Sequence, residues 1–318
     1  MSVSALILML MGPTASGKTK LAINLKKYNL INIDIISVDS ALVYRGMNIG
    51  TAKPAPEELK LAPHSLIDIR DPSEDYSVAD FYYDVNYEIE KIIKSGRIPF
   101  LVGGTMLYFK VFLEGLFFLP STNKKIRNDL EYEAQKSGWI YVFNLLNRID
   151  PIAASKIHFN DHKRIIRALE IFFVSGKTWT EWKSTPGKKL EHKIYQFAII
   201  PTNKNILNER IEKRFYKMLE IGLEKEVYTL FNRINLYKTK GNTLPSSMSC
   251  IGYRQMWEYL SGKIDYNQMI YKSIYASRRL AKHQLTWLRN WSNLHILNNN
   301  CLSAATDSIC KVVQKKIV

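Results

Sequence analysis

The chain has 318 residues, 46% of them hydrophobic, which is enough for about two domains and a sizeable core. Lys and Arg total 45 against 29 Asp and Glu, and the net charge of +16 favours a polyanionic partner over an ordinary metabolic kinase, although a coding bias would also enrich Lys. The 3 cysteines form no C-x-x-C pair and no apolar run approaches the ~20 residues of a membrane span, so we expect a reduced, cytoplasmic protein without a disulfide framework, structural zinc or membrane segment.

A phosphate-binding motif stands near the N-terminus. Ala5–Met11 is a short apolar run that predicts a buried strand, and a helical pattern opens at Lys20. A complete G-x-x-x-x-G-K-[ST] loop lies between them, and this strand, loop and helix context is the one in which the motif binds phosphate. We therefore expect a di- or triphosphate site, with Lys18 as its point charge and the Thr19 hydroxyl as a ligand for Mg²⁺. The expected site comprises Gly12, Pro13, Thr14, Ala15, Ser16, Gly17, Lys18 and Thr19.

Strands and helices alternate over the first third of the chain. Two further apolar runs, 31–38 and 98–102, predict strands. The helix between them begins at the capping box Ser77-x-x-Asp80, and Gly96 stands at its end. Such alternation predicts an α/β fold of the P-loop NTPase type, a parallel sheet flanked by helices with right-handed crossovers.

The pattern becomes helical after Pro120. A charged helix is expected over 121–138. The near-continuous apolar run 139–149 fits either a strand or a buried helix, and the spacing of its apolar residues favours the helix. A further helix follows over 161–174, and 185–189 predicts a linker. Three segments result: a phosphate-loop core over 1–120, an inserted helical domain over 121–190, and the remainder of the core with C-terminal helices over 191–318.

The last segment is predicted to contain one strand followed only by helices. Residues 196–200 predict a strand that rejoins the sheet. The chain after Asn300 carries no clear signal. The expected helices lie at about 203–219, 223–232, 247–260 and 266–290.

Ligands of open parallel sheets lie beyond the carboxyl ends of the strands. Three such ends carry the phosphate loop, Asp39-Ser40-Ala41-Leu42 and Gly103-Gly104-Thr105. Asp39 should therefore face the phosphate loop, where it is either a metal partner or a general base, unless it merely caps the next helix. Thr105 is either a site residue or the cap of its own helix.

Basic side chains cluster on three predicted helices, where aromatic residues accompany them. One such face is usually only solvated, but several faces together with the net charge favour RNA, whose bases stack on aromatic rings. Trp287 and Trp291, four residues apart, are interpreted as core residues. His158 and His162 lack a third ligand and are interpreted as structural or RNA-facing. The clusters comprise Lys163, Arg164, Arg167, Arg210, Arg214, Lys217, Tyr275, Arg278, Arg279, Lys282, His283 and Arg289.

Motifs beyond the phosphate loop recur along nearly the whole chain. They are V-D-S-A-L-V-Y-R-G-M-N-I-G-T-A-K-P (38–54), L-V-G-G-T-M-L-Y (101–108), R-I-I-R-A-L-E (164–170), C-I-G-Y-R-Q-M-W (250–257) and A-K-H-Q-L-T-W-L-R (281–289). Together they resemble the tRNA dimethylallyltransferase family. His283 stands where this family more often has Arg, and the zinc finger of eukaryotic members is absent, so the likeness is to the bacterial type.

This resemblance implies transfer of a dimethylallyl group from dimethylallyl diphosphate to the exocyclic amine of the adenosine just 3′ of the anticodon in tRNA. The phosphate loop and Mg²⁺ would bind the diphosphate, Asp39 would act as the general base, and Thr105 would orient the amine or Asp39. The basic helices would bind the anticodon stem-loop, and nothing in the sequence demands more than a monomer. The implied tRNA contacts are Asp39, Ser40, Ala41, Leu42, Thr105, Arg127, Lys163, Arg164, Ile165, Ile166, Arg167, Ser249, Cys250, Ile251, Gly252, Tyr253, Arg254, Lys282, His283, Gln284, Leu285, Thr286, Trp287, Leu288 and Arg289.

Three other functions compete with this one. A nucleotide kinase would explain the phosphate loop but not the positive charge. An RNA-stimulated NTPase would explain both, but it needs a water-activating residue and helicase-type motifs that the sequence does not show. An adenylate isopentenyltransferase acts on free nucleotide and would have no need of the basic helical segment.

Overall fold

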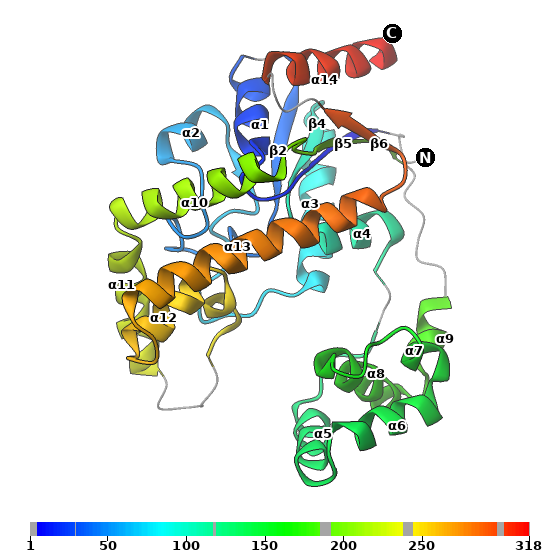
Figure 1. The fold of residues 1–318 in the computed structure, drawn as a ribbon. Coiled ribbons are helices and arrows are strands. Elements are labelled where there is room, and N and C mark those ends of the chain that lie inside the picture. Colours follow the sequence, from blue (N-terminus) through cyan, green and yellow to red (C-terminus); the bar gives the residue numbers. More distant parts are fainter. Residues whose placement is uncertain are drawn as a thin grey trace. The chain divides into compact units, whose positions relative to one another are not determined.

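The computed structural model describes residues 5–28, 30–116, 119–184, 192–237, 244–297 and 302–317, which belong to two compact units. The larger unit combines residues 1–112 with 191–318, and the smaller unit is formed by residues 113–190. A parallel sheet with helices makes up the larger unit, whereas the described residues of the smaller unit form helices alone (Figure 1). The chain therefore leaves the sheet after α4 and returns to it at β5.

The sheet of the larger unit has six strands, all parallel, in the order β3-β2-β4-β1-β5-β6. The central strand β1 lies between β4 and β5 and is buried along almost its whole length, as its unbroken apolar run predicts. This sheet confirms the expected P-loop-like α/β architecture. The strands are β1 (Leu6–Met11), β2 (Ile33–Val38), β3 (His64–Ser65), β4 (Ile98–Gly103), β5 (Lys193–Ile199) and β6 (Leu294–Leu297).

The helices of the larger unit follow the sequence signals closely where caps are present. The Ser77 hydroxyl accepts from the Asp80 N–H and the Asp80 carboxylate accepts from the Ser77 N–H, so the predicted capping box starts α3. Gly96, with φ 72°, follows the end of this helix. The helices are α1 (Lys18–Lys27), α2 (Pro56–Leu61), α3 (Val78–Lys94), α4 (Met106–Glu114), α10 (Lys204–Glu220), α11 (Leu223–Tyr237), α12 (Tyr253–Leu260), α13 (Tyr266–Arg289) and α14 (Leu302–Ile317), with a short 3-10 helix η2 (Ser246–Ser249).

Two apolar cores stabilise the larger unit. The first packs α1 and α14 against the sheet, with Leu21, Phe100 and Ile309 fully buried. The second joins the loop after β2 to helices α10, α11, α12 and α13 through residues such as Met47 and Tyr253. The second core matters for function, because it fixes the helical part of this unit beside the carboxyl ends of the strands.

The smaller unit has its own core and its own caps. Val142 and Leu146 of α6 pack with Ile165 and Leu169 of α8, all of them fully buried. The apolar spacing of residues 139–149 predicts this helix, and the structure confirms helix over strand. Its helices are α5 (Lys124–Ser137), α6 (Trp139–Ile149), α7 (Pro151–Ala154), α8 (His162–Ser175) and α9 (Trp179–Ser184).

Two expectations for the C-terminal part are wrong, and one segment without a prediction forms a helix. The strand β6 occurs where only helix was expected, because its four residues become a strand by pairing with β5. The helix expected over 247–260 is interrupted, since Gly252 adopts a φ of 89° and α12 starts only after it. The chain after Asn300 forms α14, which buries Ala305, Ile309 and Val313 at helical spacing. The linker expected over 185–189 lies outside the described residues.

Candidate active site

The phosphate loop connects β1 to α1 and turns tightly before the helix. Ala15 and Gly17 have left-handed φ values of 61° and 94°. A Cβ on Gly12 would lie 2.7 Å from the Ser16 hydroxyl, so this position requires glycine. Lys18 folds back over the loop, and its Nζ donates to the Pro13 carbonyl at 3.3 Å. Such a loop at a helix N-terminus presents N–H groups and a cation to an anion.

A glutamine from α13 joins the phosphate loop to the end of β4. The Gln284 Oε1 accepts from the Thr14 N–H at 2.8 Å, and its Nε2 donates to the Gly104 carbonyl at 2.9 Å. A Cβ on Gly104 would approach that Nε2 to 2.6 Å, so the second glycine of the Gly103-Gly104 pair makes room for the contact. Gln284, expected to contact tRNA, is instead a buried link between two loops of the larger unit.

Two half-buried cations, Lys18 and Arg214, lie at the phosphate loop. Arg214 of α10 donates a hydrogen bond to the Thr14 hydroxyl. Burial lowers the pKa of Lys18 to about 8, with Asp39 opposing the shift and Arg214 adding to it. Burial also lowers the pKa of Arg214, again opposed by Asp39. An anionic ligand would offset the cost of burying both positive charges.

Asp39 both caps a turn and faces the phosphate loop. Its Oδ1 accepts from the Ala41 N–H at 2.8 Å and from the Leu42 N–H at 3.3 Å. Its Oδ2 has no hydrogen-bond partner among the described residues. Asp39 therefore caps no helix, because turns follow it; one of its oxygens stabilises this turn, and the other is left for a ligand.

One cavity of about 610 Å³ is lined by residues at the carboxyl ends of β1, β2 and β4. Thr14, Lys18 and Thr19 of the phosphate loop line it together with Asp39 and Thr105. No described residue accepts from or donates to the Thr105 hydroxyl, so helix capping by this side chain is not observed. The lining also includes the expected tRNA-contact residues Ser40, Ala41, Leu42, Ser249, Cys250, Ile251, Gly252, His283, Gln284 and Trp287.

The cavity holds its neutral polar groups in the neutral state. Burial raises the pKa of the Cys250 thiol to about 12, with a further contribution from Asp39. Burial also raises the pKa of Tyr108, which does not itself line the cavity, with contributions from Tyr44 and Asp39. Two buried hydroxyls, Ser16 and Ser37, have no partner in the described part of the chain. Because of its raised pKa, the Cys250 thiol stays protonated at neutral pH.

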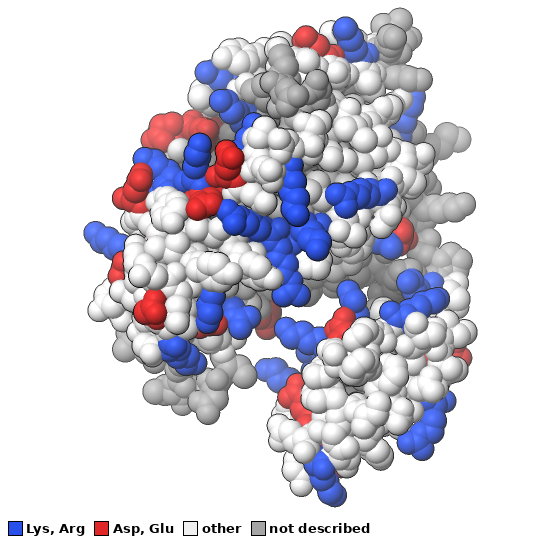
Figure 2. All heavy atoms as spheres, viewed as in Figure 1, with Lys and Arg blue, Asp and Glu red and all other residues white. Residues whose placement is uncertain are grey.

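Several other expected tRNA contacts lie elsewhere in the larger unit. Tyr253 and Leu285 pack in apolar clusters and Leu288 is buried, so these side chains support the fold. Trp287, interpreted as core, is 38% exposed and lines the cavity, which corrects that interpretation. Exposed positions that remain available for RNA are Arg254, Lys282, Thr286 and Arg289. Figure 2 shows Lys and Arg side chains gathered over α10 and α13.

The remaining expected contacts belong to the smaller unit. Lys163 and Arg164 are exposed, whereas Ile165 and Ile166 are buried in its core. Arg127 and Arg167 both bind the fully buried Glu170, with N–O distances of 2.9 and 2.6 Å. Burial raises the pKa of Glu170, but the hydrogen bonds from both arginines and from the Asn123 N–H outweigh it and keep the pKa below the usual value.

Comparison with known proteins identifies the family. A family model described as IPP transferase matches residues 42–291. The chain belongs to the IPP transferase family. It is 65% identical over 308 residues to a tRNA dimethylallyltransferase of Blochmanniella pennsylvanica (strain BPEN), which covers 97% of this chain and 100% of the relative. A tRNA dimethylallyltransferase of Blochmanniella floridana is 58% identical, with 97% of this chain and 95% of the relative covered.

Solved structures of this family share the fold. The full-length tRNA isopentenylpyrophosphate transferase of Bacillus halodurans aligns with a TM-score of 0.70 and 35% identity, covering 99% of this chain and 97% of that one. A eukaryotic dimethylallyltransferase acting on tRNA aligns with a TM-score of 0.77 and 26% identity, covering 94% and 75%. The family and the enzyme class expected from the motifs are therefore confirmed. Within the described residues, no helix is long and apolar enough to span a bilayer.

Sequence reasoning missed the place of Arg214 beside the phosphate loop. It counted this arginine among exposed basic faces, yet Arg214 lies next to the buried stripe Ile211, Phe215 and Met218 of α10. A charged residue on an otherwise apolar stripe was the available signal.

His158 and His162 are not part of a metal cluster, since the described residues contain no group of three or more His, Cys, Asp or Glu that could hold an ion. His162 stacks on Trp139 at 3.7 Å between ring centroids.

Proposed function

We propose that this chain transfers the dimethylallyl group of dimethylallyl diphosphate to the exocyclic amine of the adenosine immediately 3′ of the anticodon in tRNA. The carrying observation is one cavity that joins the phosphate loop, Asp39 and Thr105 in a member of the IPP transferase family. All lining residues come from one unit of one chain, which supports a monomeric catalyst.

The diphosphate of the donor binds at the phosphate loop. Lys18 and Arg214 supply two half-buried positive charges, and the loop supplies backbone N–H groups. When the allylic C–O bond breaks, the electron pair leaves with the diphosphate, and these cations stabilise the developing charge. The apolar side chains of Ile211, Met218 and Leu223 line the same cavity and offer contacts to the dimethylallyl group.

Asp39 receives the proton of the attacking amine. The adenine amine is a weak nucleophile because its lone pair is delocalised into the ring. As the new N–C bond forms, the amine proton passes to the free Oδ2 of Asp39, a step that contributes about 10²–10⁴-fold to the rate. The Thr105 hydroxyl, without a described partner, lies in the same cavity and orients the amine or Asp39. The target base must leave its stack to enter, at a cost of a few kcal/mol.

The donor set at this cavity fits Mg²⁺. The Thr19 hydroxyl and the Asp39 carboxylate both line it, and the Ser37 hydroxyl is buried there without a partner. Oxygen ligands of this kind suit Mg²⁺, which would neutralise charge on the bound diphosphate. Thr19 is the residue that would hold the ion, with Asp39 as a second candidate.

One experiment tests this function directly. Purified protein is incubated with labelled dimethylallyl diphosphate or γ-labelled ATP, and with tRNA or AMP. The proposal expects label from the dimethylallyl donor on tRNA alone, at the predicted adenosine. Label from ATP on any acceptor, or prenylation of AMP without tRNA, contradicts it.

Asp39→Asn tests the general base, because the amide keeps the cap but cannot accept the proton. Single-turnover transfer should fall by at least ~10²-fold while donor and tRNA still bind. A loss of donor affinity that excess Mg²⁺ restores would make Asp39 chiefly a metal ligand. Full activity would remove it from the chemistry altogether.

A further inference from the structure

The loop from Arg45 to Pro54 forms a wall shared by two cavities. Gly50, Thr51, Ala52 and Pro54 line the 610 Å³ cavity that contains Asp39. Ala52, Lys53 and Pro54 also line a second cavity of about 690 Å³ on the phosphate loop, beside Lys18 and Thr19. We call this loop the 45–54 wall. Its position therefore sets the space on both sides of the phosphate loop.

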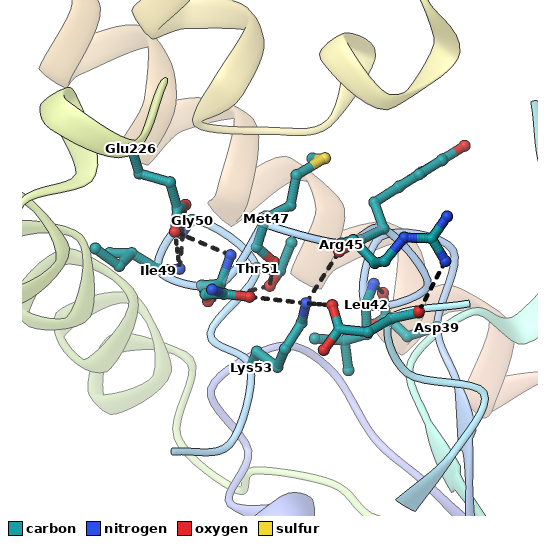
Figure 3. Close-up of polar contacts among 12 residues, drawn as sticks. Asp39, Leu42, Arg45, Met47, Ile49, Gly50, Thr51, Lys53 and Glu226 are labelled. Atoms are coloured by element: carbon teal, nitrogen blue, oxygen red, sulfur yellow. Dashed lines mark hydrogen bonds and ion pairs between the residues drawn. The ribbon is translucent and has the colours of Figure 1, made fainter. Parts of the chain in front are cut away.

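One carboxylate from a distant helix holds the 45–54 wall by its backbone. Glu226 of α11 accepts from the N–H groups of Asn48, Ile49 and Gly50, at 2.9–3.2 Å for the individual contacts. Three successive N–H groups that converge on one anion form a nest, and charge-assisted bonds of this kind are about twice as strong as neutral ones. Figure 3 shows the Glu226 side chain directed at Ile49 and Gly50.

The same carboxylate also holds the opposite side of the cavity. The Tyr253 hydroxyl donates to the Glu226 Oε1 at 2.5 Å, and the residues just before Tyr253, Cys250 to Gly252, line the cavity. The Tyr253 ring packs on Gly50 so closely that a Cβ there would lie 2.5 Å from the ring. Glu226 thus joins the 45–54 wall to Tyr253, which directly follows the 250–252 segment. The contact between the Tyr253 ring and Gly50 is a van der Waals contact.

A lysine fixes the 45–54 wall from its other end. The Lys53 Nζ donates to the Tyr44 carbonyl at 3.0 Å, to the Asn48 Oδ1 at 2.9 Å and to the Asp68 Oδ1 at 2.5 Å (Figure 3). Its side chain is only 4% exposed. Lys53 thus holds the start of the loop and Asn48, whereas Glu226 holds the backbone of Asn48, Ile49 and Gly50 beside Tyr253.

We propose that Glu226 is a positioning residue for the transfer reaction. It fixes the distance between the 45–54 wall and the 250–252 segment, and the allylic donor and the target adenosine must meet between these two walls. This inference rests on the proposed function. Glu226 does not line the cavity and so acts only through the loop and Tyr253. A displacement of about 1 Å of groups that align two reactants can cost ~10²-fold in rate, so the effect should fall on turnover.

Three variants test the proposal. Glu226→Gln keeps the size of the side chain but turns an amide NH₂ toward backbone N–H or hydroxyl donors. Tyr253→Phe removes only the hydroxyl and keeps the ring, and Gly50→Ala pushes the walls apart with the carboxylate intact. Glu224→Gln is the matched control, since Glu224 is an exposed residue of the same helix and the charge change is identical.

Measurements are the single-turnover rate at saturating substrates, the Kd for tRNA, and the thermal unfolding midpoint. We expect Glu226→Gln and Gly50→Ala to lower the rate about 10- to 100-fold, and Tyr253→Phe less, while each stays folded and binds tRNA within about threefold of the wild type. Glu224→Gln should match the wild type. Unchanged rates in folded Glu226→Gln and Gly50→Ala overturn the proposal.

A purely structural role is also distinguishable. If the rate falls only in proportion to the unfolded fraction, or if tRNA affinity and rate fall together, Glu226 does not position the reactants and the proposal is wrong. Failure of the wild type to prenylate tRNA would instead refute the proposed function, so the two failures are separate.

Discussion

Lys18 is a half-buried cation whose charge changes at mildly alkaline pH. Its pKa of about 8 lies below the usual 10.5 because burial disfavours the charged form. The ammonium is therefore present below pH 8 and is lost as the pH rises through that value. Donor affinity should be full near pH 7 and should weaken toward a tenfold loss per pH unit above about 8, until the bound form also titrates.

Lys18→Arg provides the control for this prediction, since a guanidinium stays charged throughout this range. Calorimetric titration with dimethylallyl diphosphate between pH 7 and 9.5 measures both proteins. Whatever its affinity at pH 7, the arginine variant should bind the donor equally well across this pH range. Equal pH slopes in the two proteins would assign the titration to another group.

Cys250 gives a second prediction at the scale of one residue. Burial raises its pKa to about 12, so at pH 8 only ~10⁻⁴ of the thiol is ionised. Alkylation by iodoacetamide requires the thiolate. Mass spectrometry of peptides over time should therefore show modification of Cys250 far slower than that of a model thiol. Rapid modification of the folded protein would mean that the cavity around Asp39 is more open to water than its burial indicates.

The residues of the site were predictable to unequal degrees. Thr14, Lys18 and Asp39 were found because a motif or a strand end carries them, and the structure brings them to one cavity. Arg214 and Glu226 could not be predicted in this way. Arg214 contacts Thr14 and Glu226 contacts Asn48, and in both pairs the two residues are more than 170 positions apart in the sequence. A local pattern predicts a local shape, whereas these contacts depend on how distant helices pack.

At the scale of elements, α13 is joined to the catalytic loops by one side chain. Gln284→Met keeps the length of that side chain but leaves the Thr14 N–H and the Gly104 carbonyl without their partner. Each unpaired buried group costs about 1–3 kcal/mol, so the free energy of unfolding should fall by about 2 kcal/mol and donor affinity should drop several-fold. Urea denaturation and donor titration measure the two effects.

Gln268→Met is the matched control for this change. Gln268 is an exposed glutamine of the same helix, near its N-terminal cap and away from the cavity. The control loses the hydrogen bond from the Asp265 N–H to Gln268 but should bind the donor like the wild type. If Gln284→Met also binds the donor normally, α13 does not hold the phosphate loop in its binding shape.

The elements with strong local signals were predicted well, and those that depend on distant partners were not. The capping box at Ser77 places the start of α3 correctly, and α13 spans almost the whole range expected for it. The short strands β3 and β6 have two and four residues, and only pairing with β2 and β5 makes them strands. The break at Gly252 follows from a left-handed turn that the apolar spacing of 247–260 does not reveal.

For the whole molecule, the 45 Lys and Arg residues overstate the number of cations available to RNA, because some of them are paired with carboxylates. Arg278 is paired with Glu212, and Arg127 and Arg167 are paired with Glu170. By contrast, Lys163 and Lys282 are exposed and have no carboxylate partner among the described residues. The expected contribution of a basic residue to tRNA binding therefore differs between these two groups.

The two groups can be separated within α8 itself, with Arg167→Ala and Lys163→Ala. Glu170 is fully buried, and removing Arg167 from it should lower the free energy of unfolding by about 3 kcal/mol, the low end for breaking a buried pair because Arg127 remains. Lys163→Ala should leave stability within about 0.5 kcal/mol but flatten the plot of log affinity for tRNA against log salt by about one phosphate contact. Urea unfolding and tRNA titration at several salt concentrations measure both variants. Unchanged stability in Arg167→Ala would make this arginine a phosphate contact, and an unchanged salt slope in Lys163→Ala would make that lysine merely solvated.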